Sequence, residues 1–161
     1  MRTLLVVVLL LPLLCLAAST AKDLEGDWVV DTDATWTLMQ ENPQMKAQFG
    51  SMPPEQQVMI KNMVMGKMAK MNWTLKDGQA QITEPDGAVR TSTWSVAKVE
   101  GGTFTIDAKD DQGAVRTGTL TVNGEHLIAR GFSEPGKNQV QPDTAVVMKR
   151  SVVAAAPAAA K

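Results

Sequence analysis

Methionine dominates the side chains that could bind a ligand or a metal. The chain has 10 Met, 1 His and 1 Cys, and eight of the methionines lie between Met39 and Met71. A thioether sulfur is a soft ligand that prefers Cu(I) or Ag(I), and the same flexible side chain fills irregular apolar space or re-packs around different ligands. The methionine-rich segment can therefore form part of a core, an adaptable lid over an apolar ligand, or a soft-metal site.

A soft-metal site would need several sulfur atoms on one side of a helix. At about 100° per residue, Met52, Met59 and Met63 fall within about 40° of one another, whereas Met63 and Met65 diverge by about 200°. The first three are therefore the candidate ligands for Cu(I) or Ag(I). No other metal site and no cofactor is expected, because the sequence contains neither a calcium-loop pattern nor a phosphate-binding glycine loop.

Catalytic chemistry is not expected from this chain. His126 is the only histidine, and no serine lies in a recognisable nucleophile motif. Asp110 and Asp111 are adjacent in a predicted turn, where their carboxylates are expected to be solvated. The formal net charge of −1 gives no electrostatic reason for nucleic-acid binding. We therefore predict a binding or interaction protein rather than an enzyme.

Residues 1–21 have the features of a secretory signal peptide. Arg2 precedes an apolar run from Leu4 to Ala18, which is shorter than the roughly 20 residues of a membrane-spanning helix. Ser19-Thr20-Ala21 fits the small-residue cleavage pattern, so the mature chain is predicted to start at Lys22. We expect a secreted or periplasmic protein without a stable membrane span after cleavage. Lipidation at Cys15 is the alternative.

A helical insertion is predicted over residues 33–71, after a short first strand. Asp31 or Asp33 can cap its first helix, because a carboxylate accepts the free amide hydrogens of a first turn. Pro43 and Pro54 suit the first turns of two further helices. In the last helix, apolar side chains at spacings of three to five form a stripe: Ile60, Met63, Val64, Met68 and Met71.

After Met71, tight turns separate short segments that are rich in Val and Thr. Asp77-Gly78 and Asn123-Gly124 favour two-residue hairpins. Consecutive strands joined in this way pair antiparallel, and eight strands are enough to close a sheet. We predict a mainly β domain over residues 22–150, an eight-stranded antiparallel meander β-barrel with its helices between the first and second strands. Residues 151–161 are an Ala- and Pro-rich low-complexity tail.

Gly26-Asp27-Trp28, followed by this meander, resembles the Gly-x-Trp opening of lipocalin-like and fatty-acid-binding barrels. The position of the helices is similar to the helical lid of the fatty-acid-binding group. The chain as a whole resembles bacterial exported proteins with a lipocalin-like domain. The resemblance implies a barrel that Trp28 closes at one end and that binds small molecules inside.

The function expected on these grounds is the binding of a small apolar or amphipathic molecule in the barrel under a methionine-rich lid. Trp28, Trp73 and Trp94 would line or close the cavity, and Arg130 would anchor a polar group. Arg90 is a second arginine that can point inward. The lid residues would be Met63, Met68 and Met71. Two alternatives remain: a periplasmic Cu(I)- or Ag(I)-binding protein, and a structural or protein-interaction module whose barrel is filled.

Overall fold

A computed structural model describes residues 20–132 and 145–151 of the protein. The predicted signal segment up to residue 19, which includes Cys15, lies outside the described residues, as do 133–144 and the tail residues 152–161. The elements in chain order are η1 (Ala21–Leu24), β1 (Gly26–Val30), α1 (Thr32–Glu41), α2 (Pro43–Gly50), α3 (Pro54–Met68), β2 (Asn72–Lys76), β3 (Gln79–Thr83), β4 (Val89–Glu100), β5 (Thr103–Asp110), β6 (Val115–Asn123), β7 (His126–Arg130) and β8 (Val146–Arg150).

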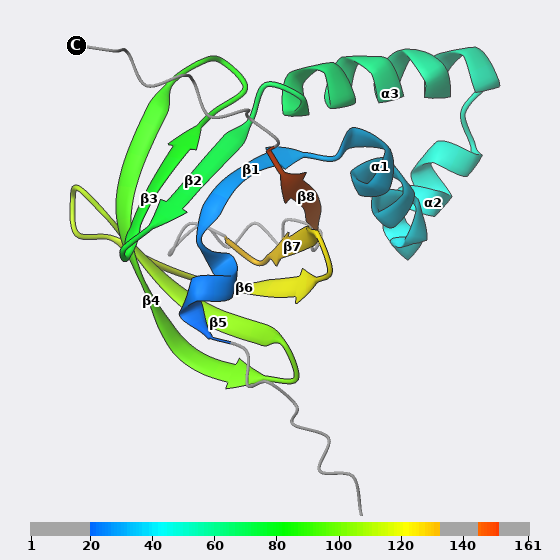
Figure 1. Ribbon diagram of the computed structural model, residues 1–161. Helices are drawn as coiled ribbons and strands as arrows, with labels where there is room; N and C mark the ends of the chain where they lie inside the picture. The colour runs from blue at the N-terminus through cyan, green and yellow to red at the C-terminus, as the bar shows by residue number, and fades with distance from the viewer. Residues whose placement is uncertain (1–19, 133–144, 152–161) are drawn as a thin grey trace, which may run out of the picture.

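The eight strands form a closed barrel in chain order (Figure 1). Each strand pairs antiparallel with its neighbours in sequence, and β1 pairs with β8 to close the sheet. The turn between β2 and β3 has the predicted two-residue form, with Asp77 at φ 49° and Gly78 at φ 74°. The prediction of an eight-stranded antiparallel barrel with helices between the first two strands is thus confirmed.

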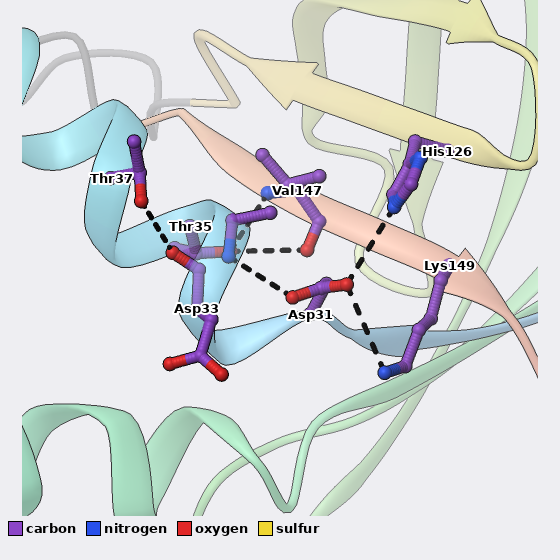
Figure 2. A network of polar contacts seen from close by, with 8 residues as sticks. Asp31, Asp33, Thr35, Thr37, His126, Val147 and Lys149 are labelled. Carbon is purple, nitrogen blue, oxygen red and sulfur yellow. Dashed lines mark hydrogen bonds and ion pairs between the residues drawn. The ribbon is translucent and has the colours of Figure 1, made fainter.

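The seam between β1 and β8 is short, and the first helix extends it. The two strands share three residue pairs, from Trp28–Arg150 to Val30–Met148. Beyond them, the buried Thr35 hydroxyl donates to the Val147 carbonyl and accepts from the Val147 amide, both at 3.0 Å (Figure 2). A side chain of α1 therefore provides hydrogen bonds that another strand residue would make, and it fixes the helical insertion to β8.

The three helices lie together on the side of the barrel where β1 and β8 meet (Figure 1), and α1 packs directly against β8. Asp31 is the N-cap of α1, since its Oδ1 accepts the Ala34 amide hydrogen at 3.0 Å. The last helix ends at Met68, one turn earlier than predicted. Within the described ranges, no helix is both long and apolar enough to span a bilayer.

One end of the barrel is closed by η1, which directly precedes β1 in the chain and contacts the distant strand β6. Leu24 of η1 is fully buried, and its carbonyl accepts the indole hydrogen of Trp28 at 2.8 Å. The Arg150 guanidinium lies over the Trp28 ring, 4.5 Å from its centroid, and donates to the carbonyls of Glu25 and Asp23. Stacking and hydrogen bonding from a single arginine therefore hold η1 across this end.

Candidate functional site

The barrel encloses a cavity of about 420 Å³ at the end opposite η1. Its lining comes from the five consecutive strands β2 to β6, from the turn after β5, and from Phe132. No described residue of β1, β7, β8 or the helices takes part in this lining. The cavity therefore occupies one side of the barrel interior, while the opposite side is filled by side chains.

The cavity wall is apolar in its depth and polar at its rim. Leu75, Ala80, Trp94, Ile106 and Leu120 belong to the apolar wall, and all five are buried in the core. The rim lies where β4 and β6 begin and β5 ends, and its polar members include Arg90, Ser92, Asp110, Gln112 and Arg116. Such a gradient suits a ligand with an apolar body and a polar group.

Two of the charged rim groups have partners in the protein itself. The Arg90 Nε lies 2.7 Å from Glu84 Oε1. Asp110 Oδ1 accepts the amide hydrogens of Gln112 at 3.0 Å and Ala114 at 2.8 Å, which fixes the turn between β5 and β6. The charge of Arg90 is therefore balanced by Glu84, and the Asp110 carboxylate orders the turn. Together they do not make the rim strongly positive or strongly negative.

The two tryptophans of the cavity wall differ in their hydrogen bonding. The Trp94 indole nitrogen donates to the Gln79 carbonyl at 3.0 Å, which holds its ring against the sheet. The Trp73 Nε1 is buried and has no hydrogen-bond partner in the structure. Because a buried donor without a partner costs free energy, an acceptor supplied by a ligand would stabilise the Trp73 side of the cavity.

The aromatic residues singled out in the sequence fall at two places. Trp73 and Trp94 line the cavity. Trp28 does not, because its ring is fully buried against η1 and Arg150 at the closed end. Trp28 is thus part of the closure of the barrel and has no surface toward the cavity.

Arg130 is not among the residues that line the cavity. In β7 the buried residues are Leu127 and Ala129, so the alternation of a strand places Arg130 on the outer face, opposite Thr119 of β6. The arginines of the cavity are Arg90, the second arginine predicted to point inward, and Arg116, which was not predicted. Alternation along β6 from Leu120 is the signal that could have identified Arg116.

The predicted lid methionines do not line the barrel cavity either. Met63 is 56% exposed, whereas Met68 and Met71 pack against the core cluster of the barrel. The one buried methionine of this helix is Met65, which the predicted stripe omitted and which is not a member of the barrel's core cluster. The helix carries apolar side chains on all its sides, so spacing alone could not indicate which side faces the barrel.

The candidate soft-metal ligands do not share one helix. Met59 and Met63 lie one turn apart on the exposed side of α3, with Met59 70% exposed. Met52 precedes the helix, which starts at Pro54, so the helical angle calculated for it does not apply. Among the residues that the structure describes, no group of three or more His, Cys, Asp or Glu could hold a metal ion.

A second cleft, of about 360 Å³, lies within the helical insertion. Trp36, Met39, Met45 and Phe49 contribute to it, and the Trp36 and Phe49 rings meet edge to face with centroids 5.1 Å apart. Part of the methionine-rich segment therefore packs with aromatic rings between α1 and α2, away from the barrel cavity.

The sole histidine belongs to a polar cluster on the outside of the barrel. Its Nε2 lies 3.6 Å from Asp31 Oδ2, and Lys149 Nζ lies 3.8 Å from the same oxygen (Figure 2). The hydrogen bond from the Ala34 amide holds the pKa of Asp31 below its usual value, and Lys149 and His126 act in the same direction against partial burial. This cluster fixes the start of α1 to β7 and β8.

No protein-family model matches the chain, and neither a curated protein nor a solved structure matches it with significant similarity. The function proposed for the protein therefore depends on the geometry of the barrel cavity.

Proposed function

We propose that the protein binds a small apolar or amphipathic molecule, without covalent chemistry, in the cavity lined by β2 to β6. The observation that carries this proposal is a cavity of about 420 Å³ with an apolar wall and a polar rim. Small-molecule sites commonly measure about 300–1,000 Å³ and combine a mainly apolar wall with a few polar groups. A barrel completely filled by side chains would have no such space.

A neutral polar group suits the rim better than a strongly charged one. Arg90 is paired with Glu84, and Asp110 accepts two amide hydrogens. The partnerless Trp73 Nε1 favours a ligand that carries an acceptor oxygen. A long-chain alcohol, ketone or ester has this combination of an apolar body and one uncharged acceptor.

The predicted signal peptide indicates where the protein would bind its ligand. Its removal would leave a secreted or periplasmic protein without cysteine, because Cys15 is the only one in the chain. Such a protein would bind its ligand by packing and hydrogen bonds, without dependence on the redox state of the compartment.

Tryptophan fluorescence can test the site directly, because two of the four tryptophans line it. We expect a neutral long-chain alcohol to change the emission of the purified protein. Trp94→Phe should remove a large part of the change, whereas Trp36→Phe, in the helical insertion, should leave it intact. Native mass spectrometry of the same samples would show whether the alcohol binds with one-to-one stoichiometry.

A blocking variant separates the cavity from the surface. Ala108 lines the cavity, and its neighbour Lys109 is exposed on the other face of β5. Ala108→Phe should abolish binding of the alcohol, and Lys109→Phe, the same new side chain on the outside, should not. Equal binding by wild type and Ala108→Phe would place the ligand elsewhere and would refute the proposal.

A further inference from the structure

Phe132 extends from the end of β7 into the barrel interior, where glycine leaves room for it. A Cβ atom at Gly118 of β6 would lie 2.7 Å from the Phe132 ring and 2.8 Å from the Arg130 carbonyl oxygen. Both distances are far below van der Waals contact, so a side chain at position 118 is incompatible with the ring in this place. The Phe132 ring therefore lies directly on the backbone of β6.

The other side of the same ring touches the opposite wall of the barrel. Phe132 meets Trp73 of β2 edge to face, with centroids 5.9 Å apart. In the closed order of eight strands, β2 and β6 are separated by three strands in either direction. The contact from Gly118 through Phe132 to Trp73 thus spans the whole width of the barrel.

This aromatic pair stands at the border between empty and filled space. On one side lies the cavity, whose lining comes from β2 to β6. Both rings also pack against the buried core cluster, to which β1, β7 and β8 contribute Val30, Leu127, Ala129 and Met148. Phe132 is consequently a wall of the cavity that belongs to neither set of strands.

The backbone before Phe132 explains why its ring points inward. Along β7, Arg130 is on the outer face, and regular alternation would place residue 132 on that face as well. Gly131 adopts φ 77°, a left-handed conformation that interrupts the alternation and turns the next side chain into the barrel. The inward position of the ring is therefore built into the local backbone.

We propose that Phe132 sets the upper size limit of the ligand, as a wall that Gly118 and Trp73 hold in place. This inference rests on the proposed binding function. A ligand extends along the apolar wall as far as the Trp73–Phe132 pair, and chains that would pass this pair are excluded by the ring. Replacing Phe132 by a smaller residue opens the space that the ring occupies, so longer ligands are accepted.

The size limit can be measured with saturated primary alcohols of increasing chain length, which compete with the neutral fluorophore N-phenylnaphthylamine. The proteins compared are wild type, Phe132→Leu and Phe132→Ala. Phe49→Ala is the matched control, since it truncates the same residue type in the helical insertion. Each added methylene that is buried contributes about fourfold in affinity, so room for two more should strengthen binding of the longest alcohols by about 15-fold.

The expected result is a preference that shifts to longer alcohols in the order wild type, Phe132→Leu, Phe132→Ala, with no shift in Phe49→Ala. An unchanged length preference in both Phe132 variants, with wild type still binding, would overturn the size limit and leave the binding function intact. If neither wild type nor the variants bound any alcohol or the fluorophore, both proposals would fall.

A measurement without ligand tests the contact between the Phe132 ring and Gly118 independently. Gly118→Ala should lower Tm, because its methyl group meets both the ring and the Arg130 carbonyl. The decrease should be smaller in the Phe132→Ala background, where only the carbonyl contact remains. Equal decreases in the two backgrounds would show that the ring does not lie on Gly118 in solution.

Discussion

At the scale of single residues, Thr35 joins the helical insertion to the barrel through two buried hydrogen bonds. It is a fully buried polar residue whose hydroxyl serves both the amide and the carbonyl of Val147, 112 positions away. Thr35→Val keeps the shape of the side chain but leaves the buried Val147 amide unpaired. We expect a loss of about 1–3 kcal/mol in the free energy of unfolding, measured by urea denaturation.

Thr37→Val is the matched control for this prediction. It is the same substitution on the same helix. The Thr37 hydroxyl is exposed, however, and donates to the Asp33 carbonyl within α1. The control should therefore change stability by no more than about 0.5 kcal/mol. Similar losses in both variants would indicate that helix propensity, rather than the seam, accounts for the effect.

Asp31 should make stability depend on pH in the acid range. Its pKa is lowered in the folded state, mainly by the Ala34 amide hydrogen bond and also by Lys149 and His126. The stabilisation is therefore present above the ordinary carboxyl pKa of 3.8 and is lost as the pH falls through the lower folded value. Asp31→Asn retains an N-cap, because asparagine caps about as well as aspartate, but it removes the charge.

Wild type should accordingly exceed Asp31→Asn in Tm at pH 7, and the difference should shrink below about pH 4. Thermal denaturation followed by circular dichroism across this range would measure it. Asp33→Asn, at a largely exposed carboxylate in the first turn of the same helix, is the matched control for the loss of one negative charge. A difference between wild type and Asp31→Asn that stayed constant down to pH 2 would contradict the role assigned to the Asp31 charge.

At the scale of elements, α3 shows how an apolar helix can be divided between core and surface. Met65 is 6% exposed and Met59 is 70% exposed on the same helix. Met65→Ala should cost about 2–5 kcal/mol, because it leaves a cavity, whereas Met59→Ala should change stability by no more than about 0.5 kcal/mol. Urea denaturation of the two variants would test this orientation of the helix.

The exposed methionines also separate the binding function from the soft-metal alternative. Met59→Leu combined with Met63→Leu keeps the apolar volume and removes both sulfur atoms. Binding of alcohols should remain unchanged, since neither residue lines the cavity. An increase of Tm on addition of Cu(I) that disappeared in this double variant would instead support metal binding by α3.

At the scale of the whole molecule, ligand binding should stabilise the closed barrel. A ligand at one hundred times its Kd that binds only the folded state adds about 2.7 kcal/mol. For a domain of this size, that corresponds to an increase in Tm of about 10 °C. Differential scanning fluorimetry would measure the shift, and the absence of the shift in Ala108→Phe would assign it to the cavity.

The closed barrel and its helical insertion could be predicted from the sequence, because their signals are local. Asp77-Gly78 specifies a tight hairpin, and the prolines at the helix starts mark the insertion. Strands joined by tight turns have little choice of partner, so the order β2 to β7 follows from the turns. Trp28, Trp73 and Trp94 were all predicted to line or close the cavity, and only Trp73 and Trp94 line it, because Trp28 is buried at the closed end against η1.

What only the tertiary structure decided depends on contacts between distant segments. The face of α3 that meets the barrel is one example, because apolar side chains surround the whole helix. Phe132 is another, since its inward position requires the left-handed backbone of Gly131 together with free space over Gly118 on another strand. The sequence determined which residues form strands, and packing across the barrel determined which side of its interior stays open.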